Sequence, residues 1–190
     1  MLGAHYPMTI KLSMLSILLG LGVALPQIYG LLNPAAFANA VRKFPRSLPW
    51  GYVLMLLGTG WFLWYLSQES IADFASYKNI LILGFAAVGL GACVYVQDFL
   101  AVRGLAVVLL LLAKLMVDTG RPYLPITTWV LVIQTWAYVL VLAGMWLTIS
   151  PWRLRDLLLW STANEKRIKL GCGIRLAFGL FVALLGFIKF

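Results

Sequence analysis

Long apolar stretches run along this chain, and short polar segments separate them. Each stretch is close to the roughly 20 residues that a helix needs to cross the hydrocarbon of a bilayer. The pattern predicts spans at 10–32, 48–67, 80–97, 99–117, 124–149 and 169–189. We therefore expect an all-α integral membrane protein, a bundle of about six transmembrane helices in a single domain that covers residues 1–190.

The third and fourth spans are the least clearly separated, because residues 80–117 are almost continuously apolar. A single helix of that length would measure about 57 Å, roughly twice the hydrocarbon thickness. Only Gln97 and Asp98, with Arg103 just beyond, can mark a chain reversal within the run. We therefore predict a hairpin whose chain reversal lies at Gln97 and Asp98.

Two short polar segments resemble each other, one after Asn33-Pro34 and one after Ser150-Pro151. Asn and Ser are good N-cap residues, and proline suits the first helical position. Each segment therefore predicts a short amphipathic helix in the headgroup plane, its charges toward water. Thr162 and Glu165 then have capping-box spacing, which predicts that the second short helix stops there and the last span begins.

These similarities favour a parallel repeat of helical hairpins, with units 10–67 and 124–189 around the central hairpin 80–117. The alternative is that any two hairpins with cytoplasmic loops share these features.

Composition excludes a soluble domain, because 63% of the residues are hydrophobic and only 11% are charged. The net charge of +9 indicates cytoplasmic loops beside anionic lipid headgroups rather than nucleic acid. The loop residues expected to contact these headgroups are Arg42, Lys43, Arg46, Arg153, Arg155, Lys166 and Arg167. We expect a multi-pass protein of the bacterial cytoplasmic (inner) membrane, with loops 33–47 and 150–168 inside and both termini outside.

Small residues recur in the predicted spans and allow helices to approach closely. They include Gly20, Gly22, Ala24, Gly58, Gly60, Gly84, Gly89, Gly91, Gly173, Ala177, Gly179 and Ala183. The functional alternative is that one such face docks a partner subunit or admits a flat cofactor.

Catalytic and metal-binding patterns are lacking in the sequence. His5 is the only histidine, and Cys93 and Cys172 are isolated thiols in apolar spans. This residue set excludes a metal site of ordinary ligand spacing and favours a protein that is not an enzyme. No motif names a cofactor. An intramembrane enzyme acting on a lipid headgroup is a distant alternative, since nothing supplies a base or nucleophile.

Charged residues within or near the spans are the candidate functional positions, because charge at membrane depth is costly. They are Asp98, Arg103, Lys114, Asp118 and Arg175. The structural explanation is that Lys114 and Asp118 pair one turn apart and that Arg175 extends its side chain toward the interface. The functional explanation is that Arg175 meets Asp98.

Two functions from different classes fit these observations. The first is a non-enzymatic accessory or scaffold subunit that associates with other membrane protein subunits. The second is a small transporter or ion-coupled carrier, with Arg175, Asp98, Lys114 and Gln134 as its polar lining.

Overall fold

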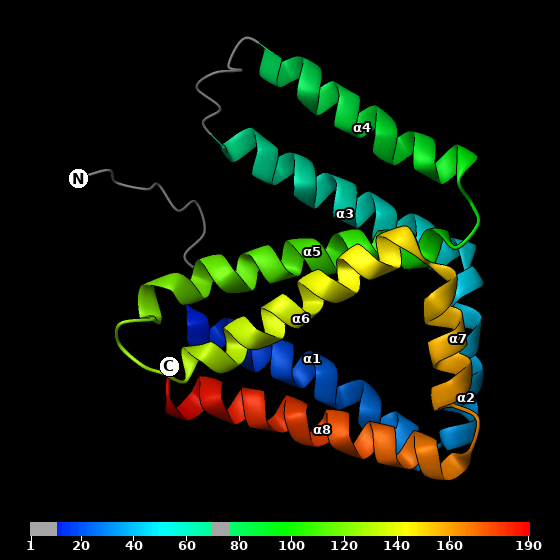
Figure 1. Ribbon diagram of the computed structural model, residues 1–190, viewed down its shortest axis with the longest axis vertical. Coiled ribbons are helices and arrows are strands. Elements are labelled where there is room, and N and C mark those ends of the chain that lie inside the picture. Colours follow the sequence, from blue (N-terminus) through cyan, green and yellow to red (C-terminus); the bar gives the residue numbers. More distant parts are fainter. Residues whose placement is uncertain (1–10, 70–76) are drawn as a thin grey trace. The chain divides into compact units, whose positions relative to one another are not determined.

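The computed structural model describes residues 11–69 and 77–190, and all regular secondary structure in these ranges is helical (Figure 1). The long helices are α1 (Leu12–Leu32), α3 (Leu48–Gln68), α4 (Lys78–Tyr95), α5 (Leu100–Gly120), α6 (Val130–Ile149) and α8 (Glu165–Ile188). The short ones are α2 (Pro34–Lys43), η1 (Phe44–Arg46), η3 (Arg121–Tyr123) and α7 (Trp152–Ser161). The all-α prediction is confirmed. His5 lies outside the described residues.

Five helices in the described ranges are long and apolar enough to cross a membrane: α1, α4, α5 with the following η3, α6 and α8. The chain therefore has the helices of a multi-pass membrane protein. Helix α3 has 21 residues but does not meet the same criterion. Its tryptophans, tyrosines and glycines lower its mean hydropathy, although Trp and Tyr suit a membrane interface. The sixth span stays a prediction.

The predicted reversal at Gln97 and Asp98 is confirmed, since α4 ends at Tyr95 and α5 begins at Leu100. The start of α6 is later than predicted. Residues 121–129 instead form η3 and a run of turns, in which Thr127 N–H donates to the Tyr123 carbonyl at 3.0 Å.

The predicted break between the second short helix and the last span is present, since α7 ends at Ser161 and α8 begins at Glu165, but the exact start of α8 and its cap differ from the prediction. This helix begins at Glu165, four residues before the predicted start, and Asn164 holds its N-cap position. The capping box at Thr162 is wrong, because the Thr162 hydroxyl donates to the Leu158 carbonyl at 2.7 Å. That bond satisfies a carbonyl at the end of α7, as residues near helix ends commonly do.

The two predicted short helices are present, and each has ten residues. Pro34 is the first residue of α2, and Phe37 N–H donates to the Asn33 carbonyl at 3.0 Å, as expected at an N-cap. In the second segment Pro151 precedes the helix by one residue. The position of both helices in the headgroup plane stays a prediction.

The chain divides into two compact units. Among the described residues, the first unit contains 11–40, 114–138 and 158–190, and the second contains 41–69, 77–113 and 139–157. These units do not follow the predicted repeat, since each takes residues from both hairpins. The repeat and the single-domain organisation stay predictions.

Helices α1 and α8 of the first unit run antiparallel and side by side (Figure 1). Small residues form their seam. A Cβ added at Gly20 would lie 2.5 Å from the Gly179 carbonyl oxygen and 2.6 Å from the Ala183 nitrogen. Close approach through Gly20, Gly179 and Ala183 is therefore confirmed, whereas Gly22 and Gly173 face open space.

Helix α3 of the second unit packs against both α4 and α5. With α4 it is antiparallel, and the Phe62 and Phe85 rings meet edge-on at 4.9 Å. With α5 it is parallel, because Gly51 meets Ala101 and Gly58 meets Val107. The starts of α3 and α5 therefore lie at the same end of the unit.

Candidate functional site

The turn between α4 and α5 fixes the start of α5. Phe99 has a φ of 54°, a left-handed conformation that is rare outside glycine. Its carbonyl accepts hydrogen bonds from the backbone N–H groups of Val102 at 2.9 Å and Arg103 at 3.1 Å. Leu100 is 1% exposed and lies against Gly51 of α3. The turn is therefore held by the helix start that follows it and by α3.

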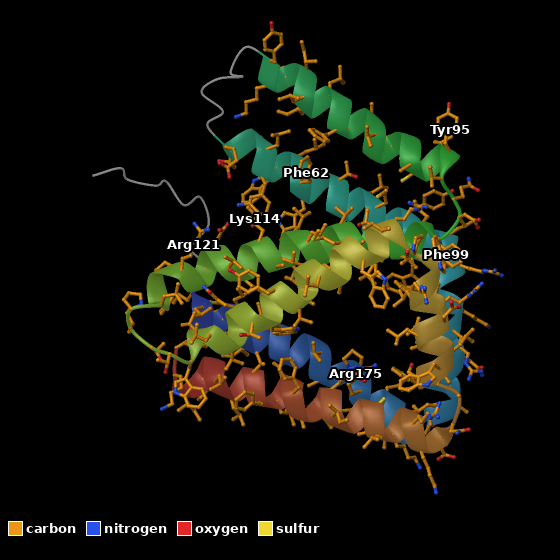
Figure 2. All side chains as sticks on the ribbon, in the orientation of Figure 1. Phe62, Tyr95, Phe99, Lys114, Arg121 and Arg175 are labelled. Carbon is orange, nitrogen blue, oxygen red and sulfur yellow. The ribbon has the colours of Figure 1, made fainter. Side chains whose placement is uncertain are left out.

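Two arginines lie at this turn (Figure 2 labels Phe99). The Arg46 guanidinium carbon is 5.9 Å from the centroid of the Phe99 ring, a cation–π arrangement. The Arg103 Nε is buried and has no hydrogen-bond partner among the described residues. Asp98 is exposed. None of the ion pairs among the described residues involves these three charges.

Helix α7 also contacts this part of the second unit. Leu154 packs against the cluster of Val102, Ala106 and Leu147, which Phe99 also joins. Arg153, which precedes Leu154, is exposed, and Arg155 bonds Asp156 at 2.8 Å. We refer to Arg46, Phe99 and Arg103 as the Arg103 cluster.

Two basic residues at the start of α8 make contacts within the first unit, and one of them, Arg167, was predicted to contact headgroups. The Arg167 guanidinium lies 5.1 Å from the Trp160 ring centroid and donates to the Trp160 carbonyl at 3.4 Å. Lys169 pairs with Glu165 at 2.7 Å. These residues belong to the charged start of α8, which precedes its apolar residues.

The predicted pair in α5 is confirmed (Figure 2 labels Lys114). The Lys114 Nζ lies 2.8 Å from the Asp118 Oδ2, and the side chains are 42% and 31% exposed. An exposed pair one turn apart contributes at most about 1 kcal/mol in water. This geometry supports the structural explanation.

Arg175 is exposed on α8 and has no ion pair among the described residues (Figure 2). The charged start of α8 ends before Leu170. Arg175 lies about 8 Å beyond Leu170 along the helix axis. One turn further on, the Phe178 ring meets Trp136 edge-on at 5.2 Å. Asp98 belongs to the second unit and Arg175 to the first. Their meeting stays a prediction.

Two buried polar residues of α1 were not singled out by the sequence analysis. Ser16 is 0% exposed and Gln27 is 8% exposed. The Ser16 Oγ and Gln27 Oε1 have no hydrogen-bond partner among the described residues. The available signal was an amide directly after Pro26 within an apolar span.

Within the described ranges, no three His, Cys, Asp or Glu side chains form a group that could hold a metal ion. Cys93 and Cys172 are both buried and free. No protein-family model, curated protein or solved structure gives a match to this chain.

Proposed function

We propose that the protein is a non-enzymatic accessory or scaffold subunit of a larger membrane complex. The observation that carries the proposal is the open face of α4. This helix is the least buried of the five apolar helices. Of its 18 most apolar consecutive residues 11% are buried, against 44% for the corresponding part of α5. Gly89 packs against Thr59, but a Cβ added at Gly84 or Gly91 would meet nothing within 4 Å.

An open glycine in a membrane helix calls for an explanation, because glycine destabilises a helix interior by about 1 kcal/mol relative to alanine. Gly84, Ala87 and Gly91 are spaced by three and four residues, so they share one face of α4. Faces of this kind let two membrane helices approach closely. We assign the face to a transmembrane helix of a different subunit.

The basic segments 33–47 and 150–168 support a subunit that is anchored in a membrane. In this proposal they lie on the cytoplasmic side of a bacterial inner membrane, where Arg42, Lys43, Lys166 and their neighbours contact anionic headgroups. They anchor the subunit rather than catalyse a reaction.

The test is gentle detergent extraction from the native membrane at natural abundance, followed by separation by size and mass spectrometry of comigrating chains. We expect a large assembly with defined partners. The double variant Gly84→Leu and Gly91→Leu should release those partners. Leu90→Phe, which enlarges a different exposed face of the same helix, should keep them. Migration of the unaltered protein as this chain alone, or as copies of it, would count against the proposal.

The second candidate is a small transporter or ion-coupled carrier, favoured by the unpaired Arg175 within an apolar helix. Its polar lining would combine Arg175 with Asp98, Lys114 and Gln134. This candidate requires that Arg175→Leu abolish flux in reconstituted vesicles while the melting temperature stays the same. An unchanged flux would remove it.

A further inference from the structure

The positive charges of the Arg103 cluster are little compensated by negative charge from the protein. Arg103 is in the first turn of α5, and Arg46 immediately precedes the segment that starts α3. A helix start carries a partial positive charge, so a cation there is unfavourable and an anion is favourable. Because α3 and α5 are parallel, with Gly51 against Ala101, two such starts lie together at these arginines.

The acidic side chains near the cluster do not neutralise it. Asp156 is bound by Arg155 at 2.8 Å. Asp98 forms no ion pair with a described residue. The guanidinium groups of Arg46 and Arg103 therefore remain without a carboxylate partner among the described residues.

The chemistry of the cluster favours phosphate over other anions. Both cations are arginines, whose planar forks bind phosphate oxygens through two parallel hydrogen bonds. The Phe99 ring beneath Arg46 orients that guanidinium by a cation–π contact. Arg167, by contrast, already donates a hydrogen bond to the Trp160 carbonyl.

The surroundings identify the source of the phosphate. The apolar span of α5 begins at Leu100, so the cluster lies at the hydrocarbon boundary. Trp50 and Trp152 of the same unit are 56% and 47% exposed, as expected for rings at a membrane interface. Lipid phosphates occupy this depth, and the cytoplasmic leaflet is rich in anionic lipid.

We propose that the Arg103 cluster is a specific binding site for the phosphate of an anionic phospholipid. This inference rests on the membrane placement given under the proposed function and narrows the general headgroup contact to one site, with Arg103 as an added ligand. It does not depend on a partner subunit, because it is tested on the isolated full chain.

The experiment uses the full chain in nanodiscs of phosphatidylcholine with a minor fraction of phosphatidylglycerol. Retained lipid is measured by native mass spectrometry after transfer to detergent. The unaltered protein should retain phosphatidylglycerol selectively. Arg103→Gln and Arg46→Gln should each weaken this retention roughly tenfold, the effect of losing one charge-assisted contact. Arg121→Gln, which removes the same charge outside the loops predicted to contact headgroups, should leave it unchanged.

Two further measurements keep the result interpretable. The melting temperature in pure phosphatidylcholine should fall by only a few degrees for Arg46→Gln, since one exposed cation–π contact is lost, so Arg46→Gln carries the test if Arg103→Gln fails to fold. Inorganic phosphate in excess should leave the retained lipid in place. Equal retention in Arg46→Gln and Arg121→Gln would overturn the proposal, and displacement by inorganic phosphate would assign the site to free phosphate instead.

Discussion

The guanidinium of Arg46 lies 5.9 Å from the ring centroid of Phe99, which joins the segment before α3 to the turn before α5. The same ring packs on the apolar cluster around Val102 and Leu147. Phe99 therefore links a basic surface segment to the interior of the second unit, and this double contact accompanies a left-handed backbone.

Two substitutions distinguish the contribution of the Phe99 ring to the apolar cluster from that of its contact with Arg46. Phe99→Ala should lower the free energy of unfolding by about 2 kcal/mol, since a partly buried ring is lost from an apolar cluster. Arg46→Ala should cost only about 0.5–1 kcal/mol, the value of an exposed cation–π contact. Thermal unfolding in a single detergent measures both. Equal losses would show that the ring does not stabilise the interior.

The seam between α1 and α8 should tolerate no added side chain at Gly20. Gly20→Leu would place a Cβ against the backbone of Gly179 and Ala183, so we expect loss of most folded protein. Gly22→Ala is the matched control, because Gly22 faces open space, and it should be neutral or stabilising by up to about 1 kcal/mol. Size-exclusion profiles and melting temperatures report both. A well-folded Gly20→Leu protein would refute the packing.

Removal of the buried amide of Gln27 should not destabilise the protein. The Gln27 Oε1 is buried and has no hydrogen-bond partner in the part of the chain that the structure describes, and replacement of such a group by an apolar one of similar shape is neutral or stabilising. We expect Gln27→Leu to change the unfolding free energy by no more than about 1 kcal/mol in the destabilising direction. The melting temperature in detergent is the measurement. A large loss would mean that the amide has a bonding partner in the folded protein.

The positions of the apolar helices followed from the sequence because their lengths match the bilayer and their reversals carry polar residues such as Gln97. The start of α8 did not follow from hydropathy. Its first turn is charged, and the pairing of Lys169 with Glu165 at 2.7 Å supports helix beyond the apolar run.

The candidate site was only partly predictable. Asp98 and Arg103 were identified as charges at a span boundary, but the contact of Arg46 with Phe99 is long-range and carries no local pattern. The left-handed backbone of Phe99 has no sequence signal either, since glycine and asparagine are the usual residues there. Sequence alone likewise cannot tell the packed Gly89 from the open Gly84, because only the fold places Thr59 beside one of them.

The parallel contact of α3 with α5 has a consequence for biosynthesis. Helix α3 does not meet the hydropathy criterion that five other helices satisfy, so it gains less than they do from entering lipid by itself. Gly104 of α5 approaches the Met55 backbone so closely that an added Cβ would lie 2.7 Å from its nitrogen. Because α4 is synthesised between them, α3 acquires this close neighbour only after two further helices have left the ribosome. If α3 forms the predicted sixth span, its packing in the membrane is therefore complete only after α5 has been made.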